Sequence, residues 1–124
     1  MKRFALVPVF AIAVAGVTMA QPASDPVRGK TVYARCAACH DLNTGATRLG
    51  PSLKGIFGRT SGTMPNFNYS QAMKAKAVVW NADTLDAYLA APAKNIPGNR
   101  MAFPPMANAQ DRADLIAFLK QSAR

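Results

Sequence analysis

The sequence predicts an all-α domain built from short helices and long loops. Three observations predict it. Apolar residues recur at helical spacing near the C-terminus, residues 41–69 are rich in glycine and proline without a sustained period, and no alternating stretch is long enough for a sheet. A loop region of that length in a compact domain needs something to wrap. The fold is therefore expected to form around a bound group.

The segment Cys36-Ala37-Ala38-Cys39-His40 identifies that group. Two thiols separated by two residues and followed directly by an imidazole are typical of c-type haem attachment. Each cysteine can bond one vinyl group of the porphyrin, and a neutral imidazole is a suitable axial ligand for iron. The sequence predicts one covalent haem c, attached at Cys36 and Cys39 and ligated by His40.

Other uses of this motif fit less well. The chain contains two cysteines and one histidine, so a closed zinc site cannot be assembled, and three such crowded ligands make a poor catalytic zinc site. A thioredoxin-like pair needs a helix that starts at the motif, whereas residues 41–45 have the composition of a turn and loop. A simple disulfide or dithiol is the remaining alternative.

The first twenty residues are interpreted as an export signal. Lys2-Arg3 gives a positive start, residues 4–17 an apolar run, and Thr18-Met19-Ala20 a cleavage site, with Ala23 as the alternative site. A retained membrane anchor is less favoured, because the run is shorter than the ~20 residues that a spanning helix needs. The chain is thus divided into a cleaved signal peptide, 1–20, and one domain, 21–124, located in the periplasm.

The predicted mature chain of 104 residues carries 13 basic and 6 acidic side chains, a net charge of +7 before any haem propionates are counted. One domain of this size gains only modest stability from an apolar core, which a buried haem would enlarge. A basic protein of this kind is expected to seek acidic partner surfaces. Nucleic acid is excluded as a partner, because the protein is exported and its basic residues are scattered rather than clustered.

Helix signals divide the rest of the chain. Asp25 and Pro26 suit the cap and first position of a helix that runs to about Cys36, within which Gly29 is best explained by the close approach of another helix. Further helices are expected over 71–76, 84–91 and from 108 onward. Their expected caps are Ser70, Asp83 and Asn108, Pro92 is expected to stop the second, Pro97-Gly98 to form a turn, and the last to bury Leu115, Ile116, Phe118 and Leu119.

Composition alone does not identify the second axial ligand. His40 is the only histidine, so the sixth ligand is a methionine, a lysine, water or nothing. The methionines outside the signal are Met64, Met73, Met101 and Met106, and the usual role of methionine is core filling. Met101 is preferred, because the turn at residues 97–100 presents its thioether from a non-helical segment far along the chain from His40.

Taken in order, the motifs resemble the class I soluble cytochromes c, of the mitochondrial type and their bacterial periplasmic relatives. The resemblance covers essentially all of residues 25–121. It is carried by Gly29, Tyr33, the CAACH motif, Gly50-Pro51-Ser52-Leu53, Gly55-Ile56-Phe57-Gly58-Arg59, Phe67-Asn68-Tyr69, Trp80, Thr84-Leu85, Tyr88-Leu89, Ile96-Pro97-Gly98, Met101, Phe103 and residues 114–119.

The resemblance implies a class I cytochrome c fold and roles for individual residues. The Pro51 carbonyl would accept a hydrogen bond from His40, and Gly29 would let the first and last helices cross against Leu115 and Phe118. The residues implied to hold a propionate are Arg59, Tyr69, Trp80 and Asn99, and Tyr88 would lie beside the sulfur of Met101. Ordinary core packing is the alternative for the aromatic residues. Met73 replaces a common family asparagine, so the buried-water network of the family is not assumed there. Ala93, Arg100 and Pro104-Pro105 also depart from common family residues, so partner choice is expected to differ.

The implied function is one-electron transfer, not enzyme catalysis. A monomeric carrier would shuttle electrons from a quinol-oxidising complex or dehydrogenase to a terminal oxidase, peroxidase or photosynthetic reaction centre. It would meet acidic surfaces of redox membrane complexes or soluble redox enzymes through Arg35, Arg48, Lys94 and Arg100, with only peripheral membrane association. A haem peroxidase, a nitrite-reducing domain or a ligand sensor would need an open sixth position and, for peroxidase chemistry, a distal acid-base group that the chain lacks.

Overall fold

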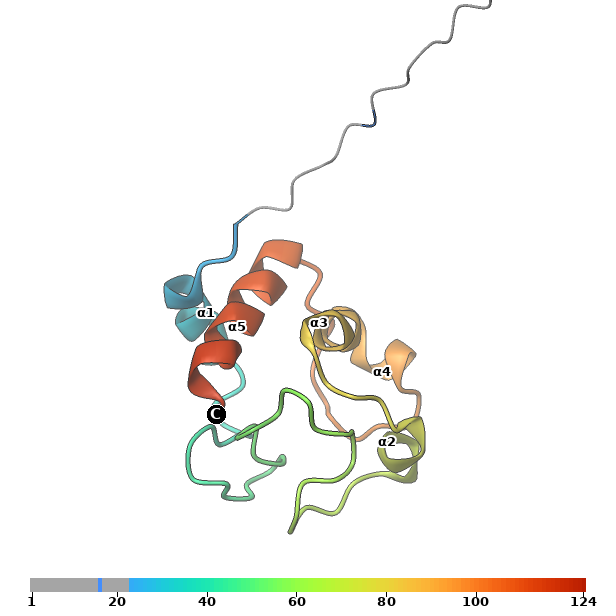
Figure 1. Ribbon diagram of the computed structural model, residues 1–124. Helices are drawn as coiled ribbons and strands as arrows, with labels where there is room; N and C mark the ends of the chain where they lie inside the picture. The colour runs from blue at the N-terminus through green and yellow to red at the C-terminus, as the bar shows by residue number, and fades with distance from the viewer. Residues whose placement is uncertain (1–15, 17–22) are drawn as a thin grey trace, which may run out of the picture.

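The computed structural model describes Gly16 and residues 23–124 of the chain (Figure 1). Apart from Gly16, the predicted export signal lies outside the described residues, and its cleavage stays a prediction. Five helices form the described part: α1 (Pro26–Tyr33), α2 (Gln71–Lys76), α3 (Ala82–Ala90), α4 (Pro92–Asn95) and α5 (Ala109–Ser122). The only strand-like pairing among these residues is a single bridge between Thr60 and Val79, so the predicted all-α class is confirmed.

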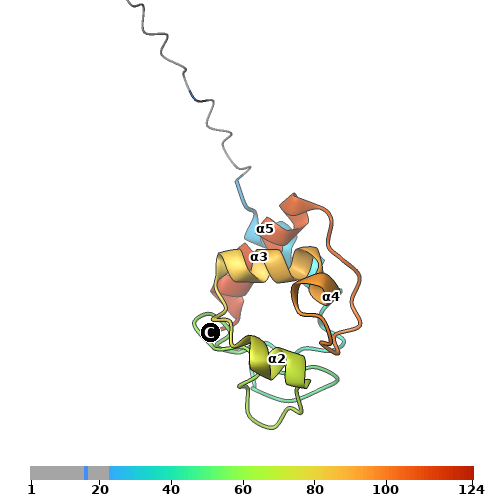
Figure 2. The same cartoon turned by 90° about the vertical axis from the view of Figure 1, so that its right-hand side faces the viewer.

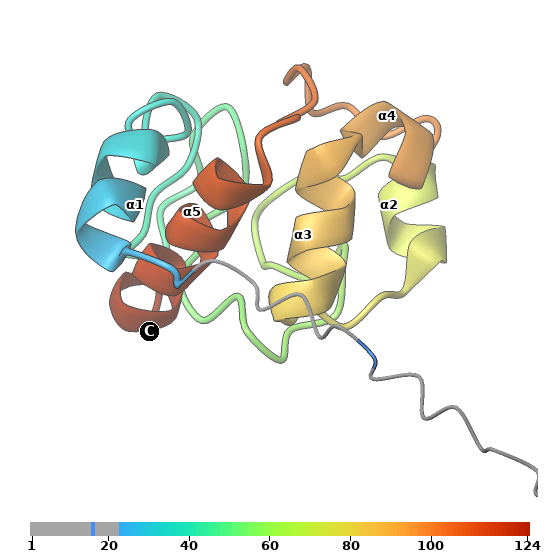
Figure 3. The same cartoon turned by 90° about the horizontal axis from the view of Figure 1, so that it is seen from above.

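Helices α1 and α5 cross on one side of the molecule, and α3, α4 and α2 lie on the other (Figure 3). Gly29 makes the crossing possible. A Cβ atom built there would lie 2.0 Å from the carbonyl oxygen of Asp114 and 2.8 Å from the Cβ of Phe118. The predicted close approach is present, although the nearest backbone belongs to Asp114 and not to Leu115.

A polar network fixes the same crossing. The buried carboxylate of Asp114 accepts hydrogen bonds from the backbone N–H of Asp25 at 2.7 Å, from Arg28 Nε at 2.6 Å and from Gln110 at 2.7 Å. Arg28 also pairs with Asp111. A buried charge needs such partners, so the network holds the start of α1 against the start of α5.

The helix starts follow local capping chemistry, with one correction. Asp25, Ser70 and Asn108 cap α1, α2 and α5 as predicted. Asp83 is not the cap of α3. Asn81 caps that helix through a reciprocal arrangement with Thr84, because its amide oxygen reaches the third helical N–H, and Asp83 therefore lies in the first turn.

One helix end differs from the prediction. α1 ends at Tyr33 and continues as hydrogen-bonded turns through Cys39, instead of running to Cys36 as a helix. α3 ends at Ala90, directly before the non-helical residue Ala91 and Pro92, as predicted. Pro92 also begins the short helix α4, where its missing N–H has no helical partner to lose. None of the helices in residues 23–124 is long and apolar enough to cross a membrane.

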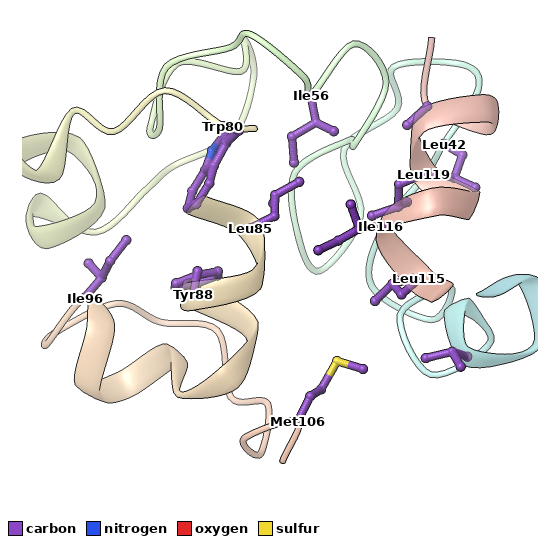
Figure 4. Packing of buried hydrophobic residues seen from close by; sticks show 12 residues of the cluster. Leu42, Ile56, Trp80, Leu85, Tyr88, Ile96, Met106, Leu115, Ile116 and Leu119 are labelled. Carbon is purple, nitrogen blue, oxygen red and sulfur yellow. The ribbon is translucent and has the colours of Figure 1, made fainter. Parts of the chain in front are cut away.

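The loops between α1 and α2 pass beneath the helices and complete the domain (Figure 2). Its apolar core has two halves (Figure 4). Trp80, Tyr88 and Ile96 belong to the side of α3 and α4, and Leu115, Ile116 and Leu119 belong to α5. These six side chains are at most 6% exposed. Leu85 and Ile56 lie between the halves, and both line a cavity there.

Candidate haem site

A cavity of about 600 Å³ lies within the ring of helices and loops. That volume is ample for a large cofactor, and most of the lining is apolar. The cavity brings together nine of the ten site residues predicted from the sequence: Cys36, Cys39, His40, Pro51, Arg59, Tyr69, Trp80, Tyr88 and Met101. The tenth, Asn99, does not line it.

His40 is held in one orientation by backbone atoms. Its backbone N–H donates to the Cys36 carbonyl at 3.0 Å, which closes the turn that presents both cysteines. Its Nδ1 lies 2.7 Å from the Pro51 carbonyl oxygen, the hydrogen bond that the family resemblance implied. A carbonyl can only accept, so Nδ1 carries the proton and Nε2 keeps its lone pair for a metal.

Burial lowers the pKa of His40, although the hydrogen bond to Pro51 opposes this shift. Burial therefore favours the neutral imidazole, which is the form that binds iron. Gly50 packs against the same ring. A Cβ atom at Gly50 would lie 2.6 Å from His40 Cε1, so only glycine allows this ring position.

Tyr33 is a site residue whose role the sequence did not predict. Its hydroxyl donates to the backbone carbonyl of His40 at 2.7 Å, and its ring packs on Phe118 of α5, with centroids 5.5 Å apart. The available signal was a tyrosine near the end of an amphipathic helix, three residues before the first cysteine. Tyr33 links the α1–α5 crossing to the predicted iron ligand.

The opposite polar corner of the cavity contains Arg59 and Tyr69. The Arg59 guanidinium is half-buried and donates to the carbonyls of Ser52 at 2.8 Å and Lys54 at 3.0 Å, and to the sulfur of Met64 at 3.0 Å. None of its recorded partners in the described residues is a carboxylate. Burial lowers the pKa of Arg59 and raises that of Tyr69.

A half-buried cation on a cavity wall without an anionic partner fits a cofactor that brings its own carboxylates. Tyr69 can donate its hydroxyl proton, because that oxygen already accepts from the backbone N–H of Met64 at 3.2 Å. Two thiols, a neutral imidazole and this cationic corner form a donor set that suits haem with its two propionates. The residues present therefore fit the predicted group.

The four candidate methionines separate by position. Met101 and Met73 line the cavity, Met106 is 3% exposed within the core, and Met64 contacts Arg59. The hydroxyl oxygen of Tyr88 lies 3.9 Å from the sulfur of Met101, as the resemblance implied. Burial raises the pKa of Tyr88 to about 12, so this hydroxyl stays protonated. Ligation of iron by Met101 stays a prediction.

Asn99 has a different role from the predicted propionate contact. Both hydrogens of its side-chain amide donate to backbone carbonyls, those of Pro92 at 2.9 Å and Ile96 at 2.8 Å. No N–H of this side chain is left for a propionate. Its oxygen instead contacts Tyr88 and the backbone N–H of Met101.

Basic side chains also lie at the cavity wall. Arg35 and Arg100 are part of its lining. The guanidinium of Arg35 lies 5.9 Å from the ring centroid of Phe103, Arg100 donates to the Asn68 carbonyl at 3.0 Å, and Arg48 donates to the Ala37 carbonyl at 3.1 Å. The contacts of Arg48 and Arg100 hold their guanidinium groups in place without neutralising their charge, whereas Arg35 also forms an ion pair with Asp111 at 3.9 Å.

Comparisons with known proteins agree with this site. The family model for cytochrome c matches residues 26–123. Cytochrome c of Ulva intestinalis is 47% identical over 103 residues, which cover 82% of this chain and 93% of that protein, and cytochrome c 2.1 of Caenorhabditis briggsae is 49% identical over 100 residues, covering 80% and 89%. The structure of cytochrome cH from Methylobacterium extorquens superimposes with a TM-score of 0.75 at 33% identity and covers 80% of this chain and all of that one. The chain belongs to the cytochrome c family, whose members are electron-transfer proteins, not enzymes, and carry a covalent c-type haem.

Proposed function

We propose that the protein is a periplasmic one-electron carrier with His40 and Met101 as axial ligands of its haem. The observation that supports this proposal best is that one cavity is lined by both cysteines, by a histidine fixed in its metal-binding tautomer, and by Met101 from a distant segment. Bound haem supplies an iron that gains or loses one electron. The export signal predicted for residues 1–20 supports the location.

The protein's contribution is a rigid and largely apolar site. The His40 ring and backbone are fixed by hydrogen bonds, and the backbone of Met101 is fixed by a hydrogen bond to Asn99, so little of the backbone has to move when the charge of the site changes. Thioether ligation and burial both favour the less charged ferrous state, which raises the potential relative to other haem proteins. Such a site suits transfer in both directions between membrane complexes.

Partner recognition is proposed to use four basic residues, of which Arg35 and Arg100 line the cavity. Arg35, Arg48, Lys94 and Arg100 would face acidic patches on a quinol-oxidising complex or dehydrogenase and on a terminal oxidase, peroxidase or reaction centre. Contacts of this type are small and short-lived, which suits a monomer that associates only peripherally with the membrane.

Two measurements test this function. The absorption spectrum of the holoprotein should show a low-spin haem with a sulfur-to-iron charge-transfer band in the ferric form, and a high-spin resting ferric protein would exclude the carrier. After cell fractionation, the holoprotein should appear in the periplasmic fraction without the first twenty residues. A protein found only in the cytoplasm would contradict the location.

The docking surface needs a kinetic test. Electron transfer to the acceptor should slow as ionic strength rises, because salt screens exposed opposite charges beyond about 10 Å at 0.1 M. Arg35→Glu and Lys94→Glu should slow association several-fold at low salt, and the matched variant Lys120→Glu, on α5, should slow it less. Equal effects of all three variants would indicate a response to net charge, not a docking face.

A further inference from the structure

Asn99 is a fully hydrogen-bonded side chain immediately before the Arg100-Met101 dipeptide. Its nitrogen donates to the Pro92 carbonyl at 2.9 Å and to the Ile96 carbonyl at 2.8 Å. Its oxygen lies 2.9 Å from the backbone nitrogen of Met101 and 3.1 Å from the hydroxyl oxygen of Tyr88. All four hydrogen-bonding positions of the amide are occupied.

These partners allow only one orientation of the amide. The carbonyls of Pro92 and Ile96 can only accept, so they must face the NH₂ group, and the Met101 N–H can only donate, so it must face the oxygen. Exchanging the oxygen and nitrogen of Asn99 would break three of the four hydrogen bonds.

This orientation decides where the proton of Tyr88 goes. The Asn99 oxygen cannot donate, so the 3.1 Å contact exists only if the Tyr88 hydroxyl donates to it. A hydroxyl has one proton, and a carboxamide oxygen at 3.1 Å is a much better acceptor than a thioether at 3.9 Å. The Tyr88 hydroxyl therefore donates its proton to the Asn99 oxygen and not to the sulfur of Met101.

We propose that Asn99 is a positioning residue that sets the donor strength of Met101 toward iron, by drawing the Tyr88 proton away from the sulfur and by fixing the backbone of the ligand segment. A hydrogen bond to the sulfur would withdraw electron density from the ligand and favour ferrous iron, which raises the potential. Without that hydrogen bond, the sulfur keeps its electron density for the metal. This inference rests on the proposed ligation by Met101.

A double-mutant cycle on the midpoint potential tests the proposal with the holoprotein. Tyr88→Phe alone should change the equilibrium between the two oxidation states by less than twofold, about 18 mV for one electron, because the substitution removes no hydrogen bond to the sulfur. Asn99→Ala frees the Tyr88 proton for the sulfur and also loosens the segment. Only the first effect requires Tyr88. The shift of midpoint potential caused by Asn99→Ala should therefore be more positive with Tyr88 present than in the Tyr88→Phe background. The difference should correspond to at least a twofold change in the redox equilibrium, about 18 mV.

The spectrum provides a second readout and separates this proposal from the assignment of the ligand. The ferric charge-transfer band should be unchanged in Tyr88→Phe and should move in Asn99→Ala only when Tyr88 is present. Absence of the band from the wild-type protein would refute ligation by Met101 itself. With the band present, a large shift of potential in Tyr88→Phe alone, or an Asn99→Ala shift that is equal in both backgrounds, would overturn the role of Asn99. The Tyr88→Phe result stands even if Asn99→Ala does not fold.

Discussion

The two walls of the cavity that supply the predicted iron ligands are held by different means. The wall of His40 depends mainly on backbone atoms, namely the Cys36 and Pro51 carbonyls and the bare backbone of Gly50, and on one side-chain hydroxyl, that of Tyr33. The wall of Met101 depends on side chains, above all Asn99, which joins α4, Tyr88 and the ligand segment.

This difference suggests that the two ligands respond differently to mutation. His40 is held by two backbone carbonyls, those of Cys36 and Pro51, and adjoins the covalent attachment sites, so loss of one side chain leaves the other contacts in place. Met101 reaches the cavity on a segment without regular structure, and the hydrogen bond from its backbone N–H to the Asn99 side chain helps to hold it there. The Met101 wall should therefore be the one where single substitutions change redox properties.

The largest effect is expected from removing the ligand on the Met101 wall. Met101→Ala should leave haem attached at Cys36 and Cys39 but open the sixth position, and should lower the potential by well over 59 mV, which is a tenfold change for one electron. Voltammetry and the charge-transfer band measure both effects. Met73→Leu is the matched control, because Met73 also lines the cavity. Loss of the band in Met73→Leu or Met106→Ala, but not in Met101→Ala, would assign the ligand elsewhere.

The same contrast explains what could be predicted from the sequence. The CAACH motif, the caps at Asp25, Ser70 and Asn108, and the need for glycine at position 29 are local or steric signals, and the structure contains each of them. The role of Asn99 was not predictable from its neighbours, because its partners lie on α3 and α4 and in the Met101 segment. Tyr33 was missed for the same reason, since only the folded turn brings its hydroxyl to the His40 carbonyl.

The α1–α5 crossing supports the His40 wall, and Gly29→Ala should break it. The added Cβ would lie 2.0 Å from the Asp114 carbonyl oxygen, which is backbone and cannot move freely. The expected loss is about 1–3 kcal/mol of unfolding free energy, typical of overpacking in a tight contact. Denaturant unfolding of the holoprotein measures it, with the exposed neighbour variant Lys30→Ala as control. Equal stability of both variants would mean that the helices can separate at little cost.

A pH dependence of stability is expected from the same crossing. The backbone N–H of Asp25, followed by the side chain of Arg28, lowers the pKa of Asp114 below its usual range near 4. A carboxylate with a depressed folded-state pKa contributes stability above its unfolded pKa and loses it as pH falls through the folded value. Unfolding free energies measured from pH 7 to pH 3 should therefore fall less steeply in Asp114→Asn than in the wild type. The exposed variant Asp83→Asn should keep the wild-type slope, and a slope unchanged in Asp114→Asn would remove this carboxylate from the explanation.

The smallest effect, and the sharpest test of the comparison, is expected from Tyr33→Phe. The variant keeps the ring that packs on Phe118 and removes only the hydrogen bond to the His40 carbonyl, which is worth about 1 kcal/mol of stability. The Pro51 contact, the Gly50 packing and the Cys36 turn still hold the imidazole, so the potential and the low-spin spectrum should be almost unchanged. The Asn99→Ala variant, measured beside it, should shift the potential more for the loss of one side chain on the opposite wall. If Tyr33→Phe moves the potential as far as Asn99→Ala does, the His40 wall also depends on single side chains, and the contrast between the two walls does not hold.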